Sequence, residues 1–331
     1  MSRLRVLHVT NAYPTTKYPA YGSFIRSQIS GLSSFGVESD VLFINAKELG
    51  KKEYLKSILR IRKQISENNY KLIHCHHLYT AMAVLLACKN KALLTSFLSD
   101  GYKEIMLPGS DLYGKYLFSW VIKRSKGKIF KSSIPTELKE DKLSFYLPNG
   151  VDVDHFMPFK KKLAKDYLGL NRGKKYILFV SANDLHRKEK RYDIYRETIR
   201  ILKETYHLED IEELHMVRAN YEDLPYYYNA AEVHLLVSDF EGSPNSVKEC
   251  LSCGTKVVAR DVGNVRAMIG GVSGCEVISG DDPDSFSIAV KKAIDSNVDQ
   301  HYLREAIFDR RLDLNSKTIE LFNIYNNIVS S

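Results

Sequence analysis

Residues 233–251 read VHLLVSDFEGSPNSVKECL: an apolar run, a short loop with glycine and proline, and then a segment with helical spacing. A buried strand that leads through such a loop into a helix is the repeating unit of a parallel α/β sheet. The first turn of the helix presents backbone N–H groups to an anion, for example a diphosphate. The stretch therefore predicts an open α/β sheet with a ligand site at the carboxyl ends of its strands.

The same alternation extends outward over most of the chain. In the first half, apolar runs predict strands at 5–9, 39–44, 72–75 and 92–98, and helical spacing predicts helices at 24–35, 54–65 and 80–88. In the second half the predicted strands are 176–180, 213–217, 233–237 and 256–259, and the predicted helices are 191–205, 224–231, 247–253, 285–296 and 316–329. Strands separated by helices indicate parallel sheets.

A turn-forming cluster, PNGVD at 148–152, interrupts this alternation. We place a domain boundary there, since 331 residues suit two domains of ordinary size. The fold class is then α/β with two Rossmann-like domains, residues 1–150 and 151–311. If the two sheets face each other, the cleft between them is a natural place for a small-molecule site.

Charge is distributed unevenly along the chain. Residues 1–150 carry 23 Lys and Arg against 11 Asp and Glu, a net charge of +12, and the remainder carries 25 against 29, a net charge of −4, which gives the total of +8. A basic half suggests a polyanionic partner. No nucleic-acid recognition motif accompanies the charge, so we expect no nucleic acid and favour an anionic membrane surface.

Several classes of protein are disfavoured by the sequence. No apolar run approaches the roughly 18 residues of a membrane-spanning helix, and the N-terminus lacks the pattern of a signal peptide, so we expect a cytoplasmic protein. Five cysteines are too few for a disulfide framework, and Cys250 and Cys253 fit positions on a helix better than a redox or zinc motif. Neither a G-x-G-x-x-G nor a P-loop occurs. We expect no cofactor and no metal, although Asp152 and Asp154 form a D-x-D.

Two carboxylates flank the loop at 241–249 with the spacing E-x7-E. Glu241 precedes the predicted helix and Glu249 lies within its first turns. Ionised carboxylates accept hydrogen bonds from hydroxyl groups, so the pair can hold one sugar-containing ligand at two points. The alternative is that Glu241 caps the helix and Glu249 lies on a solvated face.

Together with this segment, four others resemble the family-4 glycosyltransferases: PNGVDVDHF at 148–156, AAEV at 230–233, VVARDVG at 257–263, and VTNAYP at 9–14 with GSF at 22–24. The resemblance implies the GT-B fold, with an acceptor-binding domain at 1–150, a donor-binding domain at 151–311 and a C-terminal helix at about 312–331 that crosses back to the first. It also implies transfer of a hexose-type sugar from a nucleoside-diphosphate sugar to a glycan or lipid-linked saccharide. Such transfer is expected to be retaining and metal-independent, and to serve cell-surface polysaccharide biosynthesis.

The resemblance assigns roles to individual residues. Glu241 would contact the donor hexose, and Lys190 would neutralise the leaving diphosphate. The residues assigned to donor binding are Gly22, Gly242, Ser243, Pro244, Asn245, Ser246, Glu249 and Arg218.

The sequence departs from the family pattern in three places. Arg191 replaces the usual glycine after the lysine, Ala182-Asn183 replaces the usual Gly-Arg, and Arg187 could supply the missing guanidinium. A solvated basic loop is the alternative interpretation of 187–191. At the acceptor side the family histidine is absent from the corresponding stretch, 97–100, where Asp100 could orient an acceptor hydroxyl or cap a helix.

The basic first half carries two segments in which cationic and apolar side chains mix, 51–65 and 115–131. Such segments suit peripheral contact with anionic lipid on the inner face of the cell membrane, although solvated outer helices look the same. The rival functions are a non-catalytic nucleotide-sugar binding protein and, on the same fold, a nucleotide-sugar epimerase or a phosphorylase.

Overall fold

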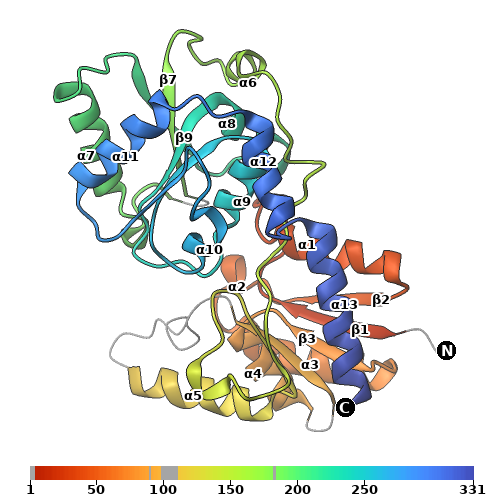
Figure 1. Cartoon of the computed structure of the whole chain (residues 1–331). Helices are drawn as coiled ribbons and strands as arrows, with labels where there is room; N and C mark the ends of the chain where they lie inside the picture. Colours follow the sequence, from red (N-terminus) through yellow and green to blue (C-terminus); the bar gives the residue numbers. More distant parts are fainter. Residues whose placement is uncertain (1–3, 89–90, 98–110, 182–183) are drawn as a thin grey trace. The chain divides into compact units, whose positions relative to one another are not determined.

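The computed structural model describes residues 4–88, 91–97, 111–181 and 184–331. It divides the chain into two compact units (Figure 1). Unit 1 comprises residues 1–15, 21–150 and 314–331, and unit 2 comprises 16–20 and 151–313. Residues 312 and 313 belong to unit 2 because Val151 pairs with both: its N–H donates to the Leu312 carbonyl at 2.9 Å, and it forms a parallel bridge with Asp313.

Unit 1 contains a parallel sheet with six strands among the described residues, in the order β2-β1-β3-β4-β5-β6. The strands are β1 (Arg5–Thr10), β2 (Glu38–Phe43), β3 (Leu72–Cys75), β4 (Leu93–Phe97), β5 (Gly127–Phe130) and β6 (Ser144–Tyr146). The helices are α1 (Ser23–Leu32), α2 (Ala46–Leu49), α3 (Glu53–Glu67), α4 (Leu78–Ala87), α5 (Asp111–Arg124) and α13 (Leu314–Ser330).

Both faces of this sheet are covered by apolar packing, which explains why its strands are continuous apolar runs rather than alternating ones. On one face, Leu7, Val9 and Ile73 pack with residues of α3 and α4. On the other face, Val6 and Leu72 pack with α1 and α13.

Unit 2 contains a parallel sheet with five strands among the described residues, in the order β11-β10-β9-β7-β8. The strands are β7 (Lys175–Val180), β8 (Ile211–Met216), β9 (Ala231–Leu236), β10 (Lys256–Arg260) and β11 (Glu276–Ile278). The helices are α6 (Lys161–Tyr167), α7 (Tyr192–Glu204), α8 (Leu224–Ala230), α9 (Asn245–Ser252), α10 (Val265–Ile269), α11 (Pro283–Asp295) and α12 (Gln300–Asp309). Residues of α7 and α11 pack on one face, and residues of α8, α9, α10 and α12 pack on the other.

The expected α/β class with two parallel sheets is confirmed. Every strand and helix predicted from the sequence is present, with ends shifted by a few residues. The elements that the sequence analysis did not predict include β5, β6, β11, α5, α6 and α12. The unpredicted strands have three or four residues, and each begins with a glycine or a polar residue, so that only two residues of each form an apolar run. Among the described residues, no helix combines the length and the apolar character that crossing a bilayer requires.

The last helix, α13, packs tightly on the unit 1 sheet. Ile328 is fully buried, and a Cβ added to Gly127 would lie 2.4 Å from its Cδ1 atom. Replacing Ile328 by alanine is expected to lower the free energy of unfolding of unit 1 by about 2–5 kcal/mol, because it leaves a cavity against β5. The change can be measured by urea unfolding followed through the fluorescence of Trp120, the single tryptophan, which lies in unit 1.

The matched control is Val329→Ala. This neighbour on α13 is 40% exposed, so its truncation should change the stability by less than about 0.5 kcal/mol. Equal effects of the two substitutions would contradict the packing described for α13.

Candidate functional site

The candidate site lies at the carboxyl ends of β7 and β9. In the sheet, β8 lies on one side of β7 and β9 lies on the other. The connections that leave β7 and β9 therefore run in opposite directions along the sheet. Ligands of open α/β sheets bind at this kind of position. The two loops that follow these strands carry Lys190 and Glu241.

Lys190 and Glu241 form an ion pair. The distance between Lys190 Nζ and Glu241 Oε1 is 2.6 Å, and the two side chains are 18% and 17% exposed. The backbone fixes their approach, since the Asp239 N–H donates to the Glu189 carbonyl at 2.8 Å and so joins the two loops next to the pair. Glu241 therefore does not cap α9, and the alternative that it does is wrong.

The loop that begins at Glu241 is held against the segment after β10. The N–H of Asn264 donates to the Gly242 carbonyl at 3.1 Å. Gly263 has a φ of 56°. A Cβ at this position would lie 2.2 Å from the backbone carbonyl oxygen of Gly242 and 2.5 Å from that of Glu241. A glycine is thus required at 263 both for its backbone conformation and for the close approach of the loop.

A buried lysine forms a hydrogen bond with the same loop. Lys248, on α9, is fully buried, and its Nζ donates to Ser243 Oγ at 2.9 Å. The Asn264 amide donates to the same oxygen at 3.2 Å. Lys248 therefore fixes the loop and adds positive charge beside the residues that the resemblance assigns to the sugar diphosphate.

His234 connects the first turn of α9 to the sheet. Its Nδ1 lies 3.1 Å from the Leu178 carbonyl and its Nε2 lies 3.0 Å from Ser246 Oγ. Burial lowers the pKa of His234 to about 4, so the ring is neutral at pH 7. Since a carbonyl only accepts, Nδ1 must carry the proton, and the Ser246 hydroxyl donates to Nε2. The charges of Lys190 and Glu241 act on this pKa in opposite directions.

Glu249 lies on α9 and accepts a hydrogen bond from the Tyr228 hydroxyl at its Oε2, at 2.6 Å. Burial raises the pKa of Glu249, while Tyr228 and Lys248 act in the opposite direction. Among the described residues no hydrogen bond reaches Oε1. Glu249 is therefore an oriented, largely desolvated acceptor, and the alternative of a solvated face residue is wrong.

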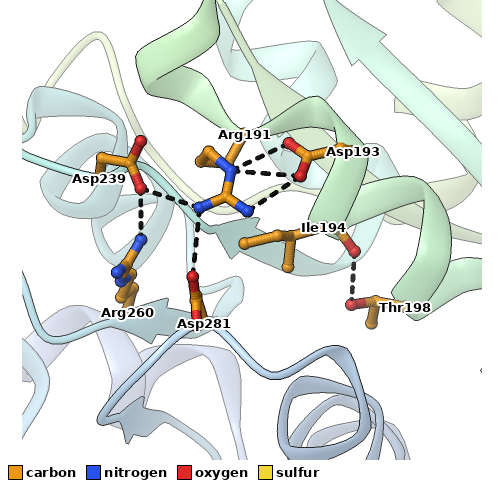
Figure 2. Close-up of polar contacts among 7 residues, drawn as sticks. All are labelled: Arg191, Asp193, Ile194, Thr198, Asp239, Arg260 and Asp281. Carbon is orange, nitrogen blue, oxygen red and sulfur yellow. Dashed lines mark hydrogen bonds and ion pairs between the residues drawn. The ribbon is translucent and has the colours of Figure 1, made fainter.

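Arg191 lies at the position where the family pattern has glycine, and Figure 2 shows the carboxylates around its side chain. Its φ is 53°, in the left-handed region that costs a non-glycine residue about 1 kcal/mol. The guanidinium binds the carboxylates of Asp193, Asp239 and Asp281, and Asp239 also binds Arg260 at 2.6 Å. These ion pairs compensate the backbone strain and connect the start of α7 to the loops after β9 and β11.

The other assigned residues are less closely connected to the ion pair. Arg187 binds Glu189 within its own turn, and Arg218 is exposed two residues after β8. Gly22 belongs to unit 1, where its φ is 73° and a Cβ would lie 2.3 Å from the Ala12 backbone, so local packing already requires glycine there. Asp100 lies outside the described residues.

Sequence reasoning missed His234, Lys248 and Tyr228 as members of the site. A histidine inside an apolar strand and a lysine on the apolar face of a helix were available signals, because buried polar side chains need partners. Two other motifs have local structural roles. Asp152 Oδ1 accepts from the N–H groups of Asp154 and His155, and Cys250 is buried on α9.

The fold corresponds to a known architecture. Two doubly wound parallel sheets, each in its own compact unit, form the architecture of the GT-B glycosyltransferases. In keeping with this, residues 174–296 match the sequence profile of the family described as "Glycosyl transferases group 1". The matched segment contains Lys190, Glu241 and Glu249, and the match agrees with a resemblance to glycosyltransferases in this part of the chain.

Solved structures with this fold cover nearly the whole chain. The sucrose-phosphate synthase of Thermosynechococcus elongatus has a TM-score of 0.73 and 14% identity, over 99% of this chain and 100% of that one. The catalytic domain of Arabidopsis thaliana starch synthase IV, bound to ADP and acarbose, has a TM-score of 0.71 and 12% identity, over 100% of both chains. The Anabaena protein HepE, in complex with UDP and glucose, has a TM-score of 0.68 and 12% identity, over 97% and 98%. No curated protein sequence matches the chain significantly.

Replacing Gly263 by alanine is expected to displace the loop at 241–242 and to weaken the binding of a nucleoside diphosphate at least about tenfold, since one lost charge-assisted contact amounts to about 1.4 kcal/mol. Gly271→Ala is the matched control, because Gly271 also has a positive φ, of 76°, but nothing lies within 4 Å of the added Cβ. Calorimetric titration of both variants with UDP and ADP measures the difference. Equal weakening in the two variants would exclude the close approach as the cause.

Proposed function

We propose that the protein is a family-4 glycosyltransferase of the GT-B class. It would transfer a hexose-type sugar from a nucleoside-diphosphate sugar to a glycan or lipid-linked saccharide, with retention of configuration, in the biosynthesis of a cell-surface polysaccharide. The observation that carries the proposal is the Lys190–Glu241 ion pair, held at 2.6 Å where the connections after β7 and β9 diverge and next to the first turn of α9.

Each group near the pair has a chemical task in this proposal. The first turn of α9, with no side-chain cap at Pro244, offers N–H groups to the diphosphate. Glu249 would accept hydrogen bonds from the ribose hydroxyls at Oε1, because Tyr228 already holds Oε2. Glu241 would accept from hydroxyls of the hexose. Structural neighbours bound to UDP and to ADP support a nucleotide in this role.

The ion pair suggests how the site responds to its donor. Lys190 and Glu241 neutralise each other in the structure described here. A bound diphosphate would draw the Lys190 ammonium toward its own negative charge, and Glu241 would then be available to the sugar hydroxyls. Donor binding would thus replace the ion pair of Lys190 with Glu241 by one with the diphosphate, and the sugar hydroxyls would donate hydrogen bonds to the released Glu241 carboxylate.

In the reaction, the bond between the anomeric carbon and the diphosphate oxygen breaks, and a bond to the acceptor oxygen forms. The acceptor hydroxyl would attack from the face that the diphosphate leaves, and its proton would pass to the departing diphosphate. Lys190 and the first turn of α9 would stabilise the developing negative charge. Arg187 would contribute a second cation by exchanging Glu189 for the diphosphate. These cations take the place of a metal ion, so the proposal requires none.

Replacing Lys190 by methionine or Glu241 by glutamine is expected to reduce donor-dependent release of nucleoside diphosphate at least about 100-fold, since each removes one charged group from the transition state. The assay screens UDP-, GDP- and ADP-sugars in the presence of EDTA. Lys188→Met is the matched control, because Lys188 is exposed in the same turn.

If both site variants released nucleoside diphosphate at the wild-type rate, this assignment of the active centre would be disproved. Release of diphosphate also separates a transferase from the two main rivals, because neither a nucleotide-sugar epimerase nor a non-catalytic binding protein liberates it.

We also propose a cytoplasmic location with peripheral contact to anionic membrane through unit 1. On α3, Leu55 and Leu59 are 64% and 70% exposed, and exposed cationic residues surround them: Lys51, Lys52, Lys56, Arg60, Arg62 and Lys63. Apolar side chains among cations suit the headgroup region, where each charge contributes about 1 kcal/mol.

The double variant Leu55→Ser/Leu59→Ser is expected to lose most of its binding to phosphatidylglycerol-containing vesicles at low salt. Leu163→Ser is the control, because Leu163 is 57% exposed but belongs to unit 2. Vesicle co-sedimentation measures the binding. Failure of the wild-type protein to bind anionic vesicles would end the membrane proposal.

A further inference from the structure

One face of the unit 1 sheet changes from apolar to polar along its strands. On the face that packs with α13, apolar residues occupy one level and polar residues follow two positions later on each strand. The apolar level is Val6, Leu72, Leu94 and Ile129, and the polar level is His8, His74, Ser96 and Lys131. All eight side chains are at most 4% exposed. The polar level lies toward the carboxyl ends of the strands.

Three histidines gather at this level. His8 Nδ1 lies 3.1 Å from His76 Nε2, and His74 contacts the Tyr325 hydroxyl of α13 at 2.7 Å. His74 also contacts Ser96 Oγ at 2.8 Å. Burial lowers the pKa of His8 to about 3 and the pKa of His74 and His76 well below 6.5, so all three rings are neutral at pH 7.

Lys131, directly after β5, is the unusual member of the group. It is 4% exposed, and no described residue forms a hydrogen bond or ion pair with its ammonium. The charge that acts on the Lys131 amine is that of another cation, Lys317 of α13. The Nζ atom of Lys317 binds Glu320 at 3.0 Å. Burial and Lys317 together lower the pKa of Lys131 to about 7. With this pKa the amine is only partly protonated at pH 7, and no described residue offers its ammonium form a counter-ion. An unpaired buried charge is costly, and groups with such shifted pKa values concentrate at functional sites.

His76 offers a hydrogen bond in the same region. Its Nε2 faces His8, and no described residue forms a hydrogen bond with its Nδ1. When the Ser39 hydroxyl donates to His8 Nε2 and His8 Nδ1–H donates to His76 Nε2, the proton of His76 stands on Nδ1. The chain of hydrogen bonds can therefore supply an N–H donor at His76, on whose pKa the charge of Lys131 acts.

A divalent cation is the competing ligand, since nitrogens of His8, His74 and His76 lie within 4.8 Å of one another. Lys131 argues against it. The Lys131 charge lowers the pKa of both His74 and His76, which means that it already opposes added positive charge at these rings. The same charge attracts an anion.

The location agrees with a ligand site. In the order β2-β1-β3-β4-β5-β6, the chain leaves β1 for β2 and then returns to β3 on the other side of β1. His8 and His76 lie on β1 and at the end of β3, so this is the unit 1 counterpart of the position that holds Lys190 and Glu241 in unit 2.

We propose that Lys131 and His76 bind an oxyanion, a phosphate or a carboxylate, carried by the acceptor. The inference rests on the proposed function, in which unit 1 binds the acceptor. It deepens that function by selecting acceptors with an anionic group, which the net charge of +12 over residues 1–150 would also attract.

The experiment uses the full chain and measures the melting temperature at constant ionic strength with inorganic phosphate, glucose 1-phosphate or glucuronate. We expect a rise for the wild-type protein and for the control Lys142→Met, whose lysine is exposed in the same unit. Lys131→Met should lose the rise, with binding weakened at least about tenfold by calorimetry. Without ligand, Lys131→Met should melt above the wild-type protein, because it removes a buried, uncompensated charge.

Phosphate can also bind at the donor site, so the comparison is repeated in a Lys190→Ala background. The effect of the Lys131→Met substitution should persist there, which makes it independent of the donor site. His76→Gln is the second variant and should weaken phosphate binding as well. Vesicles with and without phosphatidic acid show whether a lipid phosphate is the source, through binding that depends on Lys131.

An equal rise of the melting temperature in wild-type and Lys131→Met proteins would overturn the proposal. So would stabilisation by Zn²⁺ together with a tetrahedral Co²⁺ spectrum that is lost in His8→Asn, since the cluster would then be a metal site. A different result would disprove the proposed function: Lys190→Met and Glu241→Gln would retain the release of nucleoside diphosphate.

Discussion

The candidate site depends on one close approach between two loops. The turn that carries Lys190 and the loop that carries Glu241 are joined by a backbone hydrogen bond of 2.8 Å and an ion pair of 2.6 Å. Neither loop could hold this geometry alone, because isolated loops pay a large entropic cost for a single conformation. Gly263, Lys248 and the ion pairs of Arg191 restrain the loops from three further sides. The surrounding scaffold thus makes a charged pair possible at the edge of the sheet where the proposed function places the donor.

The sequence predicted the fold well where elements are long and buried on a sheet. Apolar runs such as 176–180 and 233–237 are continuous because both faces of each strand are covered, and this pattern differs from that of exposed structure. The predictions failed for β5 and β11, of four and three residues, whose pairing is decided by neighbouring strands rather than by their own composition. Local sequence does not contain that information.

The candidate site was only partly predictable for a related reason. Glu241 and Lys190 lie about 50 residues apart, and their contact follows from the strand order, which places β7 beside β9. The spacing E-x7-E singled out two carboxylates, but it could not show that Lys190 holds one and Tyr228 the other. Arg191 illustrates the opposite case: a departure from the family pattern that the sequence left unexplained becomes intelligible once three carboxylates are seen around it.

The two buried lysines show how the same residue type can have different meanings. Lys248 is fully buried and donates to Ser243, so its polar group is satisfied within the protein and its role is to support the loop. Lys131 is almost as deeply buried, yet no described residue pairs with its ammonium, and the charge of Lys317 helps to lower its pKa. A buried lysine without a counter-ion among the described residues lowers stability, since a methionine of similar shape would pack there at lower cost. The balance of charge, rather than burial itself, therefore separates a structural lysine such as Lys248 from Lys131, to which we assign an anion by proposal.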